Sequence, residues 1–454
     1  MKRVIILDAS RQGKPFNDHK EFLRLLESFD YEVVKTFRQN LTGVDKGIFL
    51  GQGKCDEIRH YLEASEIDLV LCNFDLTAMQ EKNLSEFFKA EVMDRTRVIL
   101  MIFAKNANSK IARAQVKLAM LNFERTRLVN KHAAYSQVMG GAFQSKGKGE
   151  KQINLDRRFL KREIEKAKKE LLTAKKERQV NRHKRNDLGL PVIAIAGYTN
   201  VGKTSIINEL LKRSKGTKSD VLDAYDQYFR TLSTATRLIS LNVLPDFFVI
   251  DTVGFVANLP RFLLDSFVAT LEEIKEADYV FVVFDAREFV AIDVANQEYY
   301  PDFETLNERL KVTFDVIART GFTINAENTF FLANKIDRVN IYFNGQRPLP
   351  PPVMKMFFED EYLSETGDKK EVVMHLVSKK QPDSILSIIQ ECLSRYLKDE
   401  PLLKYYFPKT EYTPYYQKYS LIFKSEQDEN YNLVTMKVYQ RHLLEMAKYR
   451  YFDA

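Results

Sequence analysis

The stretch Gly197-Tyr198-Thr199-Asn200-Val201-Gly202-Lys203-Thr204 decides how the centre of this chain folds. It matches the eight-position pattern of a phosphate-binding loop, in which two glycines frame the loop and a lysine and a hydroxyl residue close it. The apolar run Val192 to Ala196 precedes the loop, and the helical segment Ser205 to Lys212 follows it. Motif and context agree, so we predict a strand, a phosphate loop and a helix in direct succession.

Each residue type in this loop has a physical task. The glycines let successive backbone N–H groups face the α and β phosphates of a nucleotide at a helix N-terminus. Lys203 supplies a cation to the β and γ phosphates, and Thr204 is placed to ligate Mg²⁺. The nucleotide-binding residues predicted here are Gly197, Tyr198, Thr199, Asn200, Val201, Gly202, Lys203, Thr204 and Ser205.

A second motif, Asp251-Thr252-Val253-Gly254-Phe255, ends an apolar strand further along the chain. The Asp251 carboxylate can reach Mg²⁺ through water, and Gly254 can approach the γ-phosphate. We expect Thr252 and Val253 to line the site between them. A glutamine often follows this glycine and orients the attacking water, but Phe255 cannot do so. We therefore infer slow intrinsic turnover, with a backbone group, another side chain or a bound partner positioning the water.

A third motif predicts which base is bound. Asn334-Lys335-Ile336-Asp337 follows an apolar strand, and the Asp337 carboxylate can accept hydrogen bonds from both N1 and N2 of guanine. Adenine lacks that pair of donors, so the motif favours GTP over ATP. Ser378-Lys379 follows the last predicted strand, in the usual place of a loop that backs the base. The three motifs together predict a GTP hydrolase that converts GTP to GDP and phosphate.

A threonine between the first helix and the second strand should close over Mg²⁺ and the γ-phosphate. Three residues compete for this role, namely Thr231, Thr234 and Thr236. Their positions in the sequence do not by themselves decide among them.

Bulk properties exclude several classes of protein. The chain has 454 residues, 45% hydrophobic and 29% charged, and no run of about 18 apolar residues that could span a bilayer. The charged N-terminus lacks the pattern of a signal peptide and reads as a first strand. Cys55, Cys72 and Cys392 are far apart and lack metal-ligand spacing, which fits a reducing compartment. We expect a cytoplasmic protein without a membrane span.

The chain is expected to be α/β, with four segments. Residues 1–105 alternate short apolar runs with amphipathic segments, so an N-terminal α/β domain is predicted. Residues 106–188 should form a long antiparallel helical hairpin, residues 190–399 a Ras-like P-loop G domain, and residues 400–454 a small C-terminal α+β domain. The apolar runs of the N-terminal segment are Val4 to Leu7, Tyr31 to Lys35, Leu69 to Cys72 and Val98 to Phe103, with a helix at 18–29.

The hairpin segment is the most basic part of the chain. Apolar residues at helical spacing predict helices at Ile111 to Arg127 and Leu160 to Ala174, joined by a glycine- and lysine-rich tip at Met139 to Glu150. Residues 156–187 hold 13 Lys/Arg against 6 Asp/Glu, an excess equal to the net charge of +7 of the whole chain. Such a block is either a solvated helix face or a contact with a phosphate backbone.

These residues resemble the HflX family of translation-factor-related GTPases over nearly the whole chain to about residue 400. The most specific likeness is Asp251 to Val256, with Leu259-Pro260, Ala269 to Glu273 and Ala277-Asp278. The region before the phosphate loop also looks like the family's pattern. Its matching residues are Gly51 to Lys54, Gln80, Asn83-Leu84, Asp94-Arg95, Ile102 to Ala104, Gln115-Val116, Gly149-Glu150 and Asp156 to Arg158.

The resemblance implies roles for further residues. Tyr228 to Leu232 is similar to the family's switch segment, so Phe229, Arg230 and Thr231 are expected to contact the nucleotide, and Thr231 leads its competitors. The implied metal ligands are Thr204, Thr231 and, through water, Asp251; the implied catalytic residues are Lys203, Thr231 and Gly254. The chain departs from the family at Ser233-Thr234, Lys148 and Lys379, which affects the switch and the hairpin tip rather than the nucleotide chemistry.

The resemblance also implies a partner. Family members bind the large ribosomal subunit and its rRNA, and use GTP to split or recycle stalled or idle ribosomes. It favours RNA contact for the basic hairpin, with Lys146, Lys148, Arg157, Arg158, Lys161 and Arg162 as candidates. An rRNA-remodelling or assembly factor with a regulatory G domain is the alternative, and a GTPase acting only through protein partners is a third reading. We expect a monomer with Mg²⁺ as cofactor.

Overall fold

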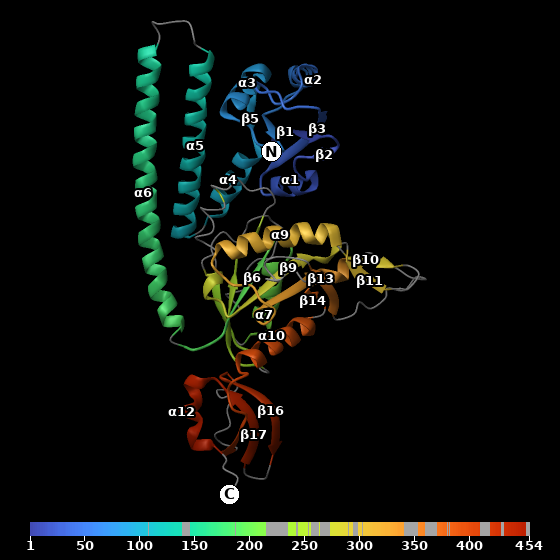
Figure 1. The fold of residues 1–454 in the computed structure, drawn as a ribbon, viewed down its shortest axis with the longest axis vertical. Helices are drawn as coiled ribbons and strands as arrows, with labels where there is room; N and C mark the ends of the chain where they lie inside the picture. The colour runs from blue at the N-terminus through green and yellow to red at the C-terminus, as the bar shows by residue number, and fades with distance from the viewer. Residues whose placement is uncertain are drawn as a thin grey trace. The chain divides into compact units, whose positions relative to one another are not determined.

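A computed structural model describes most of the chain (Figure 1). The described residues are 1–107, 109–138, 146–186, 188–214, 235–241, 244–252, 254–255, 263, 273–288, 290–293, 298–301, 303–339, 353–358, 370–378, 380, 382–408, 418–427 and 431–450. The chain divides into two compact units. One is built mainly from residues 1–176, and the other contains the phosphate loop and the C-terminal residues.

The N-terminal segment contains a mostly parallel sheet. The long strand β1 (Lys2–Arg11) pairs in parallel with β3 (Tyr31–Leu41) and β4 (Leu69–Cys72), and β4 pairs in parallel with β5 (Glu91–Met93). The remaining elements are the short strand β2 (Lys14–Pro15) and the helices α1 (His19–Leu26), α2 (Gln52–Glu63) and α3 (Ala78–Phe88). The predicted α/β pattern is confirmed.

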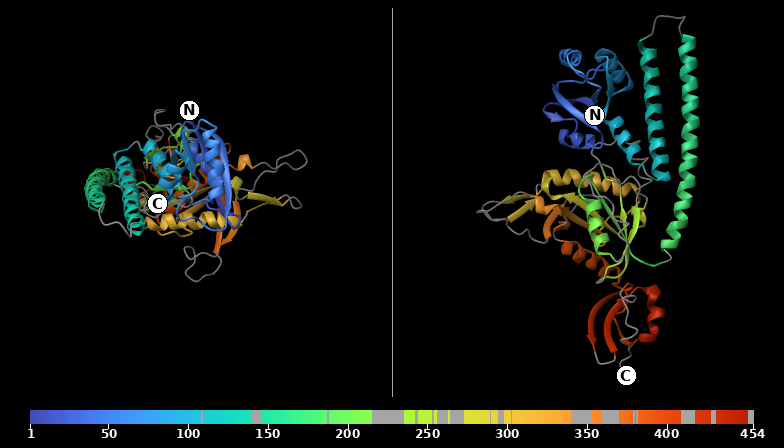
Figure 2. Two further views of the ribbon diagram at one scale, coloured as in Figure 1. Left: turned by 90° about the horizontal axis from the view of Figure 1, so that it is seen from above. Right: turned by 180° about the vertical axis from the view of Figure 1, so that it is seen from behind.

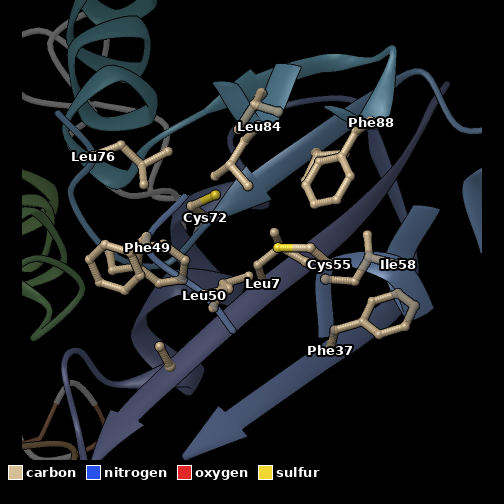
Figure 3. Close-up of a cluster of buried hydrophobic side chains, with 14 of the residues drawn as sticks. Leu7, Phe37, Phe49, Leu50, Cys55, Ile58, Cys72, Leu76, Leu84 and Phe88 are labelled. Carbon is tan, nitrogen blue, oxygen red and sulfur yellow. The ribbon is translucent and has the colours of Figure 1, made fainter. Parts of the chain in front are cut away.

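The core of this sheet lies between β1 and the helices that cover it. Figure 3 shows Leu7 beside Cys55 and Leu84 beside Cys72, with Phe37 next to Ile58 in the same apolar cluster. Both thiols are buried and free, and burial raises the pKa of Cys55 to about 11. A thiol with so high a pKa is a poor nucleophile. These cysteines therefore act as small apolar core residues.

One predicted element is corrected. The alternating pattern grouped Val98 to Phe103 with the strand-forming runs, but these residues lie in helix α4 (Arg95–Asn106). The Asp94 carboxylate accepts a hydrogen bond from the backbone N–H of Arg97 at 2.8 Å and so caps the helix N-terminus. A helix buried on several sides shows a continuous apolar run, which cannot be told from a buried strand by periodicity alone.

The helical hairpin is longer than predicted. Helices α5 (Lys110–Val138) and α6 (Lys146–Asn186) lie side by side in every view (Figures 1 and 2). Residues 146–150, expected in a non-helical tip, belong to α6. Each glycine costs a helix only about 1 kcal/mol relative to alanine, which a helix of this length tolerates. The tip residues 139–145 lie outside the described residues, and the segment boundaries stay predictions.

The phosphate loop belongs to a sheet with strand order β13-β14-β12-β9-β6-β8-β7. Neighbours pair in parallel from β14 to β8, and the two edge strands β13 and β7 are antiparallel. The central strands are buried on both faces, as parallel strands between helices are. The strands are β6 (Val192–Gly197), β7 (Ala235–Ile239), β8 (Phe247–Asp251), β9 (Tyr279–Asp285), β12 (Thr329–Asn334), β13 (Val353–Phe358) and β14 (Lys370–Leu376).

Helices α7 (Lys203–Arg213), α9 (Phe303–Arg319) and α10 (Pro382–Tyr396) connect or follow these strands, and β10 (Val290–Asp293) and β11 (Glu298–Pro301) form a separate ribbon. The apolar run Leu238 to Leu244 overlaps strand β7, which starts earlier, at Ala235, and ends at Ile239. The architecture is the predicted P-loop G domain.

The C-terminal segment is a small α+β unit, as predicted. Its antiparallel strands β15 (Leu403–Pro408), β17 (Tyr431–Val438) and β16 (Ser420–Gln427) are followed by the short helix α12 (Leu443–Met446). It is fastened to the turn before β8. The backbone N–H of Asp246 donates to the carbonyl of Lys418 at 2.6 Å, and the Tyr439 hydroxyl donates to the carbonyl of Asp246 at 3.2 Å.

A buried ion pair of the N-terminal segment is expected to matter for stability. Arg95 Nη2 lies 3.0 Å from Glu21 Oε2, and both side chains are almost fully buried. Glu21→Ala leaves the guanidinium buried without its carboxylate, and we expect about 3–5 kcal/mol less protection of the β1 amides in native-state hydrogen exchange. In the matched control Glu86→Ala, which removes the exposed pair with Lys82, we expect a change below about 1 kcal/mol. Equal effects of the two substitutions would contradict the prediction.

Candidate nucleotide site

Two glycines of the phosphate loop stand where no side chain fits. Gly197 has φ +144°, and a Cβ there would lie 2.2 Å from the carbonyl oxygen of Val283 in β9. Gly202 has φ +96°, and its Cβ would lie 2.3 Å from Nδ2 of Asn334. The loop therefore passes tightly between β9 and the end of β12 before α7 begins at Lys203.

The Lys203 side chain is folded into the loop. Its Nζ donates to the carbonyls of Gly197 at 3.0 Å and Tyr198 at 2.6 Å. The pKa of this amine is lowered to about 8, chiefly by burial; the charge of Asp251 opposes the shift and the charge of Lys335 adds to it. A cation that is buried but short of anionic partners suits a site that receives phosphates.

Thr204 and Asp251 come together from different elements. Thr204 lies in the first turn of α7 and Asp251 ends β8, and the threonine hydroxyl donates to Asp251 Oδ2 at 3.2 Å. The neighbouring Thr252 hydroxyl donates to the Ile195 carbonyl at 2.6 Å, which fixes the strand end beside the loop. A hydroxyl and a carboxylate are hard oxygen donors of the kind that Mg²⁺ prefers, so this pair fits the expected metal.

The segment after Asp251 lies directly on the phosphate loop. A Cβ on Gly254 would lie 2.7 Å from Thr199 Cα and 2.9 Å from Lys203 Nζ. Only glycine allows this approach. Phe255 joins the loop through backbone hydrogen bonds to Gly197 and Thr199. The predicted contact of Gly254 with the phosphate end of the site is thus geometrically possible.

The base-recognition motif is tied to the same loop. Asn334 Nδ2 donates to the Val201 carbonyl at 2.9 Å, and Lys335 Nζ donates to the Asn200 carbonyl. Lys335 Nζ also lies 2.9 Å from Asp285 Oδ2. Sequence reasoning missed Asp285, although its position at the end of the apolar strand β9 resembled that of Asp251. These contacts fix the position of the base motif relative to the phosphate loop.

Asp337 is presented at the edge of the site. The Ser378 hydroxyl donates to Asp337 Oδ1 at 2.7 Å, and Lys380 Nζ lies 3.5 Å from Oδ2. Burial acts to raise the pKa of Asp337, but the hydrogen bond from Ser378 and the charge of Lys380 outweigh it, and the net shift is downward. The carboxylate is therefore ionised at neutral pH, ready to accept hydrogen bonds. Lys380 was not predicted; the neighbouring Lys379 lies outside the described residues.

Several predicted residues cannot be placed. Phe229, Arg230, Thr231, Thr234 and Val253 lie outside the part of the chain that the structure describes. Their roles stay predictions.

Of the three competing threonines, only Thr236 lies among the described residues. It lies in β7, where its hydroxyl donates to Glu273 Oε2 at 3.2 Å.

The RNA-contact candidates lie on helix α6. The side chains of Arg158, Lys161 and Arg162 are exposed and that of Arg157 is partly exposed, whereas only the backbone is described at Lys146 and Lys148. A hollow on this helix is lined by Arg158, Lys161, Arg162, Glu165, Lys166 and Lys169. The basic residues thus form one exposed stripe rather than a set of buried pairs.

Among the described residues, no three His, Cys, Asp or Glu side chains form a group that could hold a metal ion. In the same part of the chain, no helix has the length and apolar character needed to cross a membrane.

The pKa of Lys203 predicts how nucleotide binding depends on pH. Bound phosphates need the charged amine, but the free site loses that proton as the pH rises through about 8. Binding then requires proton uptake, so we expect the affinity for GDP to be about tenfold weaker at pH 9 than at pH 7. Fluorescence titration across this range measures it. Lys203→Arg, which keeps its charge, should bind with no such slope; a flat profile for the unsubstituted protein would refute the assignment.

Comparison with known proteins agrees with this geometry. Family models match residues 17–104 (GTP-binding GTPase N-terminal), 106–185 (GTP-binding GTPase middle region) and 192–317 (50S ribosome-binding GTPase). The GTPase HflX of Caldanaerobacter subterraneus is 33% identical over 75% of this chain and 73% of its own length; that of Lacrimispora saccharolytica is 36% identical over 68% and 70%.

Among solved structures, a GTP-binding protein of Sulfolobus solfataricus in complex with GDP aligns over 86% of this chain and 98% of its own, with 20% identity and a TM-score of 0.42. The assignment of the family rests on the sequence relatives and the family models. The chain belongs to the HflX family of GTPases, enzymes that bind GTP and hydrolyse it to GDP and phosphate.

Proposed function

We propose that the loop from Gly197 to Thr204 holds the phosphates of GTP together with Mg²⁺. The observation that carries this assignment is the hydrogen bond between Thr204 and Asp251 at 3.2 Å, beside the buried amine of Lys203. Thr204 would ligate the metal directly and Asp251 through water. When bound, Mg²⁺ would neutralise the negative charge that develops on the phosphates during hydrolysis.

The chain's own residues then supply position and charge. Lys203 would turn from the loop carbonyls to the β and γ phosphates, and Gly254, which lies against Thr199 and Lys203, would offer its backbone N–H to the γ-phosphate. Thr231, which lies outside the described residues, would complete the metal site, as the family resemblance implies. The Phe255 side chain has no amide with which to orient the attacking water, so turnover of the isolated protein is slow and rises when a partner is engaged.

Recognition of guanine is assigned to Asp337, assisted by Asn334, Lys335, Ser378 and Lys379. The ionised carboxylate accepts the N1 and N2 hydrogen bonds, and Ser378 holds it in place. Adenine lacks this pair of N–H donors, so ATP cannot make both hydrogen bonds to the carboxylate.

A substitution at Asp337 tests the assignment. Asp337→Asn replaces one acceptor by a donor, which clashes with guanine N–H groups but suits the carbonyl of xanthine. We expect the affinity for GTP to fall by about 10² or more and that for XTP to rise, because a buried unpaired donor is costly. Competition binding with both nucleotides measures this. Asp383→Ala, an exposed aspartate at the start of α10, is the matched control. An unchanged preference for GTP in Asp337→Asn would remove Asp337 from the base site.

We further propose that the bound nucleotide controls attachment to the large ribosomal subunit, and that this attachment splits or recycles stalled or idle ribosomes. Two observations support the proposal. The family model that matches residues 192–317 is described as a 50S ribosome-binding GTPase. Helix α6 also presents the exposed basic stripe expected of a contact with rRNA phosphates. GTP would order the Thr231 and Gly254 segments and hydrolysis would release them. We expect the protein to act as a cytoplasmic monomer.

The alternative function is favoured by the same basic stripe. A factor that binds or remodels rRNA, with the G domain as a regulator, would bind RNA with equal affinity in every nucleotide state. A ribosome switch would bind only in the GTP state. Measuring the salt dependence of rRNA binding by the full chain with GDP and with a GTP analogue separates the two functions.

Sedimentation with purified large subunits tests the main proposal. With a non-hydrolysable GTP analogue we expect the protein to pellet with the subunits, and with GDP to stay largely in solution. Lys203→Ala should lose pelleting because it cannot hold the phosphates, whereas Lys212→Ala, an exposed residue of the same helix, should behave as the unsubstituted protein. Absence of pelleting in every nucleotide state would reject the ribosomal role while leaving GTP hydrolysis intact.

A further inference from the structure

The segment that stands in place of the water-orienting glutamine is fastened to the phosphate loop by its backbone. Phe255 N–H donates to the Gly197 carbonyl at 3.0 Å, and Thr199 N–H donates to the Phe255 carbonyl at 2.8 Å, which makes a short parallel bridge. The Phe255 side chain is buried. The segment thus has a defined position although its side chain offers water no polar group.

The Tyr198 side chain joins this segment to helix α9. Its ring meets that of Phe255 edge-on, with centroids 6.5 Å apart and an interplanar angle of 82°. The Arg309 guanidinium lies over the Tyr198 ring, with Cζ 4.6 Å from the centroid. A guanidinium within about 6 Å of an aromatic centroid makes a cation–π contact. A charged group from α9 is therefore coupled through one ring to the segment beside the phosphates.

Arg309 is itself held in place. Its Nε lies 3.5 Å from Oε2 of Glu288, and three-quarters of the side chain is buried. Glu288 lies three residues after Asp285, whose carboxylate pairs with Lys335 of the base motif. A guanidinium keeps its charge at any pH at which the protein is folded. Arg309 thus places a permanent positive charge next to the loop, in addition to the titratable Lys203.

We propose that Arg309 is a positioning residue for GTP hydrolysis. By stacking on Tyr198 it holds the Gly254–Phe255 segment where its backbone groups orient the attacking water. The inference rests on the phosphate loop being the GTP site and is independent of any ribosomal role. A contact that merely anchored α9 would alter stability and nucleotide affinity, whereas a positioning contact alters the hydrolytic step.

Single-turnover hydrolysis by the full chain without ribosomes tests the proposal, with the dissociation constant for GDP measured on the same samples. Arg309→Ala should slow hydrolysis by about tenfold and leave the GDP affinity within about twofold, because it removes the cation–π contact and the pair with Glu288 but no group assigned to the nucleotide. Arg309→Lys, which keeps a cation above the ring, should recover most of the rate. Lys311→Ala, at an exposed position of the same helix, is the control and should match the unsubstituted protein.

A double substitution makes the test sharper. Tyr198→Leu removes the ring through which Arg309 acts, so Tyr198→Leu with Arg309→Ala should hydrolyse GTP no more slowly than Tyr198→Leu alone. Additive losses, an Arg309→Ala rate within about twofold of the unsubstituted protein, or an equal loss of GDP affinity would each overturn the proposal. Lys203→Ala is measured in parallel: if it still binds GTP, the assignment of the site has failed rather than the role of Arg309.

Discussion

A buried ammonium group, Nζ of Lys203, is the constraint on which the rest of the site depends. Inside the protein it needs oxygen partners, which the loop supplies through the carbonyls of Gly197 and Tyr198. Those carbonyls can turn inward only because Gly197 adopts a backbone conformation closed to other residues. Gly254 must also lack a side chain, since a Cβ would lie 2.9 Å from this nitrogen. The positions of Gly197 and Gly254 thus follow from the need to bury the ammonium group of Lys203.

The surrounding sheet fixes the position of the phosphate loop. β6, β8, β9 and β12 are parallel and their carboxyl ends meet at one edge, so the residues that follow them converge there. The base motif donates side-chain hydrogen bonds to two loop carbonyls, which spaces the base from the phosphates. In the proposed function this frame holds the phosphates and the base of GTP at a fixed separation.

Phe255 stands where many GTPases have the glutamine that orients the attacking water. Its backbone is bonded to the loop, and its ring faces Tyr198, on which Arg309 stacks. The side chain that would orient water is absent, so hydrolysis depends on groups that the fold brings near rather than on the motif residue itself. In the proposed function a partner accelerates this slow turnover, and the basic stripe on α6 is a positively charged surface that a polyanionic partner would contact.

The sequence by itself determined the α/β architecture, the P-loop G domain, the family and the residues of the phosphate and base motifs. These features are local: a motif of consecutive residues and the apolar run before it predict the conformation of one short stretch of backbone. Only the tertiary structure decided that Val98 to Phe103 is helical and that Thr236 is bonded to Glu273. It also decided that Asp285 joins the base motif and Arg309 the phosphate loop. Each of these contacts joins residues far apart in the chain, and their pairing follows from sheet order and packing rather than from spacing.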